Sequence, residues 1–248
     1  MKYLLTIYLL QVGNLYQTIQ DYYLSGNDAI MKSNYDEAID KYMNILDFGY
    51  ESSDLYYNLG NAYYKNDNIG KSIWAYSKSL MLNPRDSDVK YNLSIAKARV
   101  IDQIELPKNL VLNEMYRDLR MYLITSEWFL LCSILTVVTC LIHLMLSAKI
   151  LIANTFDKIK IFLIVLNLFA HFIGFDSYLS NSYANSAVIV ENFVDVFSEP
   201  RIDNDKPLFR INEGTIVGIS NSQNNWSEIS LIDGKKGWVK DGSILVLK

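Results

Sequence analysis

The chain has 248 residues, half of them hydrophobic, and a formal net charge of −4. Its mean hydropathy is only slightly positive, so we expect soluble parts beside a limited membrane part rather than a uniform globule. Acidic residues outnumber basic ones in residues 19–105. Because such a surface repels phosphate backbones, nucleic acid is not an expected partner.

The N-terminus carries one lysine, Lys2, followed by an apolar stretch over residues 3–10 that is too short to span a bilayer. This pattern is typical of a secretory signal peptide, which we predict over residues 1–18. The following "QVGNLYQ" lacks the small-residue pattern of a cleavage site. An uncleaved anchor or the first turn of a helix therefore remains the alternative.

Residues 19–105 repeat with a period of 34. Small and bulky residues alternate in this segment, which indicates antiparallel helix pairs: a small residue lets two backbones approach, and a tyrosine fills the space beside them. We expect two such pairs and a capping helix over residues 88–102. The matched positions are Tyr23 with Tyr57 and Tyr91, Gly26 with Gly60, Ala38 with Ser72, Tyr42 with Tyr76, Asn58 with Asn92, and Leu59 with Leu93.

The second unit, "YYNLGNAYYKNDNIGKSIWAYSKSLMLNP" over residues 56–84, resembles the tetratricopeptide repeat, with serine at two positions where that family usually has alanine. The resemblance implies an α-helical solenoid whose first helices line an inner groove. Tyrosines flanked by asparagine amides suit an extended peptide, although they could also be merely exposed helix residues. The resemblance places Gln20, Ile30, Asp88 and Ile95 in this groove and assigns seven further residues to partner binding, namely Tyr23, Asn27, Asp54, Tyr57, Asn61, Tyr64 and Tyr91.

Two apolar segments, residues 127–147 and 159–179, predict a transmembrane hairpin. The loop between them, residues 148–158, is rich in lysine, so the positive-inside rule places it in the cytoplasm and both flanking parts on the opposite side. The preceding linker, residues 106–126, is either an interfacial helix on the membrane or a plain linker helix. Its apolar face comprises Leu112, Met115, Leu119, Tyr122 and Leu123.

After a short linker over residues 180–186, the last segment, residues 187–248, contains five short β-rich runs separated by turn residues. This pattern predicts a small barrel, and Asp233-Gly234 between two of the runs predicts a hairpin. The stretches "NFVDVFSEP", "EGT" and "GKKGWV" resemble bacterial SH3-like domains, although the arginine usual in the first of them is absent.

The sequence contains no motif for a nucleophile, a zinc site or a phosphate-binding loop, so we predict no enzyme activity, no cofactor and no metal. The only histidines, His143 and His171, fall in the two apolar segments at different depths. We expect neutral imidazoles that hydrogen-bond within the hairpin, near Asn167. The alternative is an intramembrane redox site that also uses Cys132 and Cys140, which lie too far apart along one helix for a disulfide.

The order of these segments resembles the BatE-type proteins of aerotolerance operons, and "SSDLYYNLGNAYY", "PLFRINEGTIV" and "GKKGWV" carry that resemblance over nearly the whole chain. It implies a multidomain bacterial inner-membrane protein, with a periplasmic tetratricopeptide solenoid, a two-helix transmembrane hairpin and a small all-β SH3-like barrel. The implied partners are von Willebrand factor A-type Bat proteins and a MoxR-type ATPase system. The expected function is that of a non-enzymatic scaffold in aerotolerance or envelope stress; the alternative is a peptidoglycan-binding adaptor for a separate cell-wall enzyme.

Overall fold

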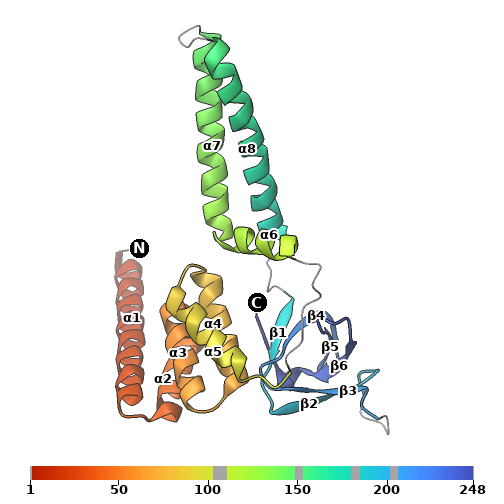
Figure 1. Ribbon diagram of the computed structural model, residues 1–248. Helices are drawn as coiled ribbons and strands as arrows, with labels where there is room; N and C mark the ends of the chain where they lie inside the picture. Colours follow the sequence, from red (N-terminus) through yellow and green to blue (C-terminus); the bar gives the residue numbers. More distant parts are fainter. Residues whose placement is uncertain (1, 103–110, 149–152, 180–184, 202–205, 248) are drawn as a thin grey trace. The chain divides into compact units, whose positions relative to one another are not determined.

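The computed structural model describes residues 2–102, 111–148, 153–179, 185–201 and 206–247 (Figure 1). Contacts within the chain divide it into two compact units. The first unit combines residues 1–106 with residues 185–248, and the second comprises residues 107–184. In its described residues, the first unit holds five helices and an antiparallel sheet region, and the second unit holds three helices.

Five helices open the first unit, and each packs against the next along the chain. Side-chain caps fix two of their starts: Ser52 accepts a hydrogen bond from the amide of Leu55, and Asp86 accepts from the amides of Asp88 and Val89. The helices are α1 (Lys2–Met31), α2 (Tyr35–Asp47), α3 (Ser53–Lys65), α4 (Ile69–Leu82) and α5 (Ser87–Ala98).

The turns inside the two helix pairs are copies of each other, one 34-residue period apart. Ser33 and Asp67 adopt left-handed backbone conformations, with φ of 58° and 62°. In both turns the next amide reaches back to a helix carbonyl, Asn34 to Ala29 and Asn68 to Tyr63, each at 2.9 Å. The sequence period is therefore a period of the backbone as well.

Glycines lie beneath tyrosine rings at equivalent places in both pairs. A Cβ added to Gly26 would lie 2.5 Å from the ring of Tyr42, and one added to Gly60 would lie 2.6 Å from the ring of Tyr76. The hydroxyl of Ser72 donates to the carbonyl of Gly60 at 2.9 Å, so α3 and α4 approach closely where the small-residue pattern predicts. Both tyrosine rings are almost completely buried.

The sheet region has seven strands rather than the five expected. The first β-rich run forms two strands, β1 and β2. Strand β3 was not predicted, because its four residues are too few to show a clear alternation of apolar and polar side chains. The strands are β1 (Ser186–Ile189), β2 (Phe193–Val196), β3 (Phe209–Asn212), β4 (Ile216–Gln223), β5 (Trp226–Ser230), β6 (Lys236–Lys240) and, after the short 3-10 helix η2 (Asp241–Ser243), β7 (Ile244–Val246).

All strand pairs in this region are antiparallel. A five-stranded sheet has the order β6-β5-β4-β1-β7, and β2 pairs with β3 in a second sheet. A bridge between Phe197 and Trp238 connects the two sheets. The predicted hairpin at Asp233-Gly234 is confirmed, since it joins β5 to β6 with Gly234 at a φ of 90°. Buried aliphatic side chains from both sheets form one core.

Helices and sheet in the first unit are connected by two carboxylates. Glu213 accepts a hydrogen bond from the amide of Gly70, at the start of α4, at 2.7 Å. Asp102 accepts from the backbone and side-chain nitrogens of Asn212 at 2.6 and 2.8 Å, and from the hydroxyl of Thr215 at 3.1 Å. The expected capping helix over residues 88–102 thus ends earlier, at Ala98, and leaves Asp102 to bind the sheet.

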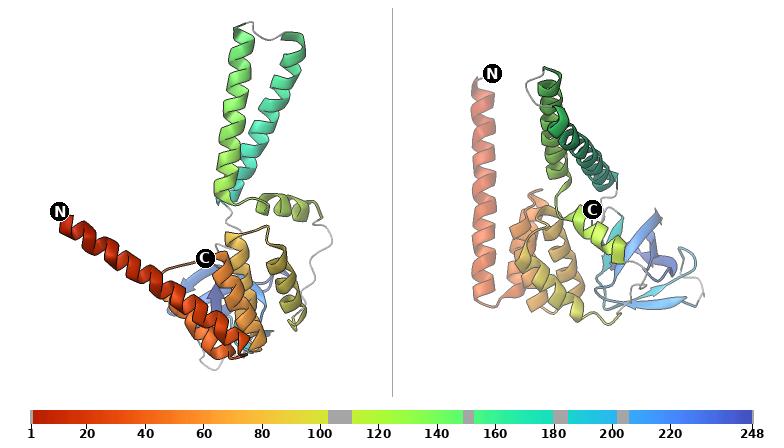
Figure 2. Two further views of the ribbon diagram at one scale, coloured as in Figure 1. Left: turned by 90° about the vertical axis from the view of Figure 1, so that its left-hand side faces the viewer. Right: turned by 45° about the horizontal axis from the view of Figure 1, so that its top comes forward.

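The second unit consists of α6 (Val111–Met121), α7 (Thr125–Ser147) and α8 (Ala153–Leu179). α7 and α8 pack as a hairpin, and α6 crosses its foot (Figure 2). Thr125–Ser147 and Lys158–Leu179 are each long and apolar enough to cross a membrane. Most apolar side chains of both helices point outward, such as Val137 and Phe162, which are 58% and 65% exposed.

Some predicted segments lie partly outside the described residues, and the predicted signal peptide ends inside a helix. The signal peptide predicted for residues 1–18 ends within α1, so its cleavage stays a prediction. Parts of the predicted linkers and of the lysine-rich loop, namely residues 103–110, 149–152 and 180–184, lie outside the described residues.

We predict that Gly60→Ala destabilises the first unit. The new methyl group would press on the Tyr76 ring, which is buried and hydrogen-bonded and cannot move away. Overpacking of this kind costs about 1–3 kcal/mol, which exceeds the gain of about 0.5–1 kcal/mol from replacing a helical glycine with alanine. Thermal unfolding of the detergent-solubilised chain, followed by circular dichroism, measures the effect.

Gly242→Ala is the matched control, because Gly242 lies in the 3-10 helix η2 of the same unit but has no atom within 4 Å of the added Cβ. This variant should unfold at the wild-type temperature or slightly above it. Equal unfolding temperatures for the two variants would contradict the close packing of Gly60 against Tyr76.

Candidate partner-binding site

A network of tyrosine and asparagine side chains crosses the first helix pair. The hydroxyl of Tyr42 donates to Oδ1 of Asn27 at 2.7 Å. Nδ2 of Asn58, from the next pair, donates to the hydroxyl of Tyr23 at 2.9 Å and to the same Oδ1 of Asn27 at 3.3 Å. One asparagine oxygen therefore accepts from two helices at once.

The same network recurs one period later. Tyr76 donates to Oδ1 of Asn61 at 2.7 Å, while Nδ2 of Asn92 donates to the hydroxyl of Tyr57 at 3.2 Å and to Oδ1 of Asn61 at 3.0 Å. We call the two sets together the Tyr–Asn ladder. It connects α1 with α2 and α3, and α3 with α4 and α5.

The ladder fixes the orientation of the Asn61 amide. Both lone pairs of Oδ1 are used by Tyr76 and Asn92, and Asn61 also lines a pocket. Among the described residues, Nδ2 of Asn61 has no hydrogen-bond partner. The part of this side chain that is left for a ligand is therefore a donor, held in place by its own oxygen.

The pocket has a volume of about 430 Å³ and lies where the two helix pairs and α5 meet. Its lining combines tyrosine rings, aliphatic side chains, two amides and one cation, a mixture suited to binding a peptide segment through both its side chains and its carbonyls. The lining residues are Ile30, Tyr35, Asn61, Tyr64, Lys65, Tyr76, Asn92 and Ile95.

The seven predicted site residues divide into three groups. Asn61 and Tyr64 line the pocket, together with Ile30 and Ile95 from the same predicted groove, whereas Gln20 and Asp88 of that groove do not. Tyr23, Asn27 and Tyr57 are half-buried members of the ladder. Asp54 and Tyr91 are exposed, Tyr91 to 67%, and neither lines the pocket.

Four lining residues, Tyr35, Lys65, Tyr76 and Asn92, were not predicted. The match of Asn58 with Asn92 across one period was a usable signal, because amides repeated at buried helix junctions tend to bond to each other. Lys65 offered no such signal, since a single exposed lysine in a helix ordinarily has no specific contact.

Charge at the pocket is supplied by cations. Lys65 is exposed at its rim, and the guanidinium of Arg99 lies 5.4 Å from the centre of the Tyr64 ring, within cation–π range. Arg99 also pairs with Asp67 at 2.5 Å. No acidic side chain lines the pocket, so its lining favours a ligand that offers acceptors or negative charge.

Burial sets the ionisation of the tyrosines beneath the pocket. It raises the pKa of Tyr42 and of Tyr76 well above the ordinary value of 10. Burial, and then the nearby carboxylate of Asp54, raises the pKa of Tyr23 as well. These hydroxyls therefore remain protonated over the whole physiological range, and those of Tyr42 and Tyr76 remain donors to the ladder.

The described histidines and cysteines of the hairpin do not form a metal-binding cluster. Nδ1 of His171 lies 2.9 Å from the carbonyl oxygen of Asn167, whose amide donates across the hairpin to Thr136 at 3.1 Å, so His171 bonds within the hairpin as expected. Cys132 and Cys140 are both free thiols. In the parts of the chain that the structure describes, no cluster of three His, Cys, Asp or Glu side chains could hold a metal ion.

Comparison of the chain with protein-family models gives no match, and a search of curated proteins finds none that is similar to it.

We predict that the first unit loses stability as the pH rises above about 10. In the unfolded chain Tyr42 and Tyr76 would ionise near their ordinary pKa, whereas the folded state keeps them protonated. Unfolding then releases protons, and stability falls as the pH rises from about 10, by up to about 1.4 kcal/mol per pH unit for each tyrosine. Thermal unfolding measured between pH 8 and pH 12 shows the slope.

Tyr76→Phe distinguishes the loss of stability caused by tyrosine ionisation from other effects of alkaline pH on the protein. The variant should be less stable at pH 8, because Asn61 loses one donor, yet its stability should fall less steeply above pH 10. An unchanged alkaline slope would contradict the assignment of the titration to this buried hydroxyl.

Proposed function

We propose that this protein is a non-enzymatic scaffold of a bacterial inner membrane that binds a partner protein in the pocket beneath its repeated helix pairs. In this proposal the helix pairs are a short tetratricopeptide-type solenoid, and the sheet region is an SH3-like barrel that provides a second protein-binding surface. α7 and α8 span the membrane. The first unit faces the periplasm, opposite to the lysine-rich loop between them.

The observation that carries this proposal is the Asn61 amide. A side chain that lines a pocket, and whose oxygen is fully occupied while its nitrogen has no partner among the described residues, is suited to donate to a main-chain carbonyl of a bound segment. The rings of Tyr35 and Tyr64 provide apolar area beside it, and Lys65 favours an acidic or C-terminal group. A peptide segment of a protein partner has all three features.

The exposed apolar surfaces of α7 and α8 support the membrane part of the proposal. Both helices are long and apolar enough to span, and their outward side chains would be unfavourable in water. The resemblance to BatE-type proteins suggests the setting: a complex with von Willebrand factor A-type Bat proteins and a MoxR-type ATPase system, in aerotolerance or envelope stress.

A photo-crosslinking amino acid in place of Tyr64 tests the pocket in native membranes. We expect it to capture a specific membrane or periplasmic protein, identified by mass spectrometry, because Tyr64 lines the pocket. The same label at Tyr50, an exposed tyrosine outside the pocket, is the control and should not capture that protein. Equal capture from both positions, or none from Tyr64, would count against the pocket as the partner site.

Asn61→Asp distinguishes ligand binding from support of the fold. The carboxylate can still accept from Tyr76 and Asn92, so the ladder persists, but the amide donor of this pocket-lining residue is lost. We expect near wild-type thermal unfolding and a marked loss of crosslinking at Tyr64. Asn61→Ala should lose both, because it also leaves the buried Tyr76 hydroxyl without its acceptor and Asn92 with Tyr57 alone, at a cost of about 1–3 kcal/mol.

Asn27→Asp is the matched control, since Asn27 has the same place in the first pair but does not line the pocket. It should retain crosslinking at Tyr64. If Asn61→Asp and Asn27→Asp behaved alike, the Asn61 amide would have no special role in binding.

A further inference from the structure

α6 carries an apolar face that no described part of its own unit covers. Met115 and Leu119 lie one turn apart on it and are 64% and 44% exposed, and Tyr122, directly after the helix, continues the face at 59% exposure. In a soluble helix such a face would be the one packed against its neighbours. Here it points away from them.

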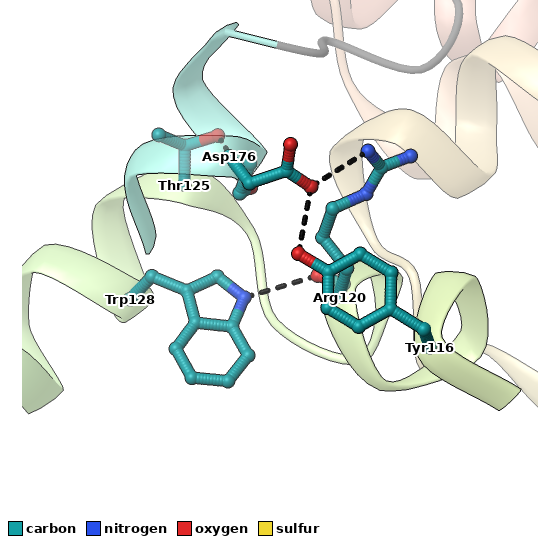
Figure 3. Close-up of polar contacts among 6 residues, drawn as sticks. Tyr116, Arg120, Thr125, Trp128 and Asp176 are labelled. Carbon is teal, nitrogen blue, oxygen red and sulfur yellow. Dashed lines mark hydrogen bonds and ion pairs between the residues drawn. The ribbon is translucent and has the colours of Figure 1, made fainter. Parts of the chain in front are cut away.

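The contacts between α6 and α8 are polar instead. Oδ2 of Asp176 accepts a hydrogen bond from the hydroxyl of Tyr116 at 2.9 Å and pairs with Nη1 of Arg120 at 3.1 Å (Figure 3). The Arg120 side chain is only 14% exposed and that of Asp176 32%. The one carboxylate near the end of α8 is thereby neutralised by α6.

A second set of contacts fixes α6 relative to α7. Nε1 of Trp128 donates to the carbonyl oxygen of Arg120 at 3.0 Å, and the Trp128 ring is buried (Figure 3). Thr125 and Ser177 share a hydrogen bond at 3.2 Å where α7 begins and α8 ends. α6 is therefore held across the foot of the hairpin at a defined angle and is not a free linker.

The rotation of α6 follows from these contacts. At 100° per residue, the face with Met115 and Leu119 lies roughly a quarter turn or more from the side that carries Tyr116 and Arg120. Docking on Asp176 therefore leaves the apolar face open. The polar side of α6 bonds to Asp176 of α8, and the apolar side remains available for contact with lipid.

The surface beside α6 is itself apolar and rich in aromatic side chains. Phe129 and Tyr178 are exposed at the same end of the hairpin, with ring centres 6.2 Å apart, and Phe175 is 59% exposed. Aromatic residues gather where membrane-spanning segments meet the headgroup region. The exposed aromatic side chains and the open face of α6 thus lie at the same end of the hairpin.

From this geometry we propose that α6 lies in the headgroup region of the bilayer, with Met115, Leu119 and Tyr122 inserted among the lipids. The inference rests on the proposed membrane insertion of α7 and α8. The Asp176–Arg120–Tyr116 cluster positions α6 at that depth, on the side of the membrane where α8 ends. Because α6 contains two acidic and two basic residues, its insertion depends on apolar contact and does not require anionic lipid.

Site-directed spin labelling of the full chain tests this proposal in bilayers of phosphatidylcholine alone. Single cysteines replace Leu119, Asp118 and Val137 in a chain that carries Cys132→Ala and Cys140→Ala. Each nitroxide is exposed to oxygen, which concentrates in lipid, and to a water-soluble nickel complex. We expect oxygen collisions to dominate at Leu119→Cys and Val137→Cys, and nickel collisions at Asp118→Cys, with Met115→Cys as a second label on the apolar face.

The label on α7 separates the two proposals. Dominant oxygen collisions at position 137 with nickel access at both 118 and 119 would overturn the interfacial placement of α6 and leave the membrane hairpin intact. Nickel access at all three positions would overturn the hairpin's insertion and the placement of α6 with it.

Discussion

The arrangement of the helices in the first unit depends on asparagine side chains that bond across one repeat period. In each pair one oxygen, of Asn27 or Asn61, accepts from a tyrosine of the same pair and from an asparagine of the next. Because the two donating tyrosines are buried and the asparagines half-buried, a missing partner would leave a buried hydroxyl unsatisfied, at a cost in stability. The ladder therefore specifies how each helix pair meets the next, beyond what apolar burial alone would fix.

In the proposed function, the same side chain contributes to stability and to recognition. The Asn61 oxygen bonds to α4 and α5, and its nitrogen is left to donate to a segment bound in the pocket that Asn61 lines. The glycines beneath Tyr42 and Tyr76 allow the rings to lie deep enough for their hydroxyls to reach the ladder. Small residues, buried rings and amide oxygens form one interdependent arrangement.

Part of this arrangement could be predicted from the sequence, because local periodicity encodes it. The spacing of 34 residues predicted the helix pairs and the close approach of Gly60 and Ser72, and runs of apolar residues predicted the two membrane-length helices. The resemblance to the tetratricopeptide repeat pointed to Asn61 and Tyr64, but it did not separate ladder residues from pocket residues, since both occupy the inward side of a helix. That distinction depends on which atoms meet in three dimensions.

The contacts that could not be predicted join residues far apart in the chain. Asp102 binds Asn212 and Thr215, and Glu213 binds the start of α4, across more than a hundred residues. Nothing in the sequence distinguishes Asp102 and Glu213 from the other carboxylates, most of which are expected to be solvated at the surface. Their effect is that the sheet region is fastened to the helices within one unit, and a partner in the pocket and a partner on the sheet would be held at a fixed separation.

A double-mutant cycle between Asn61→Ala and Asn92→Ala tests the central role of the ladder most directly. The free energy of unfolding of the full chain is measured in urea for the wild type, both single variants and the double variant. If the two side chains support one junction, the effects should be non-additive, with a coupling of about 0.5–3 kcal/mol. Effects that add within about 0.5 kcal/mol would show that the two asparagines act independently, and would contradict the account.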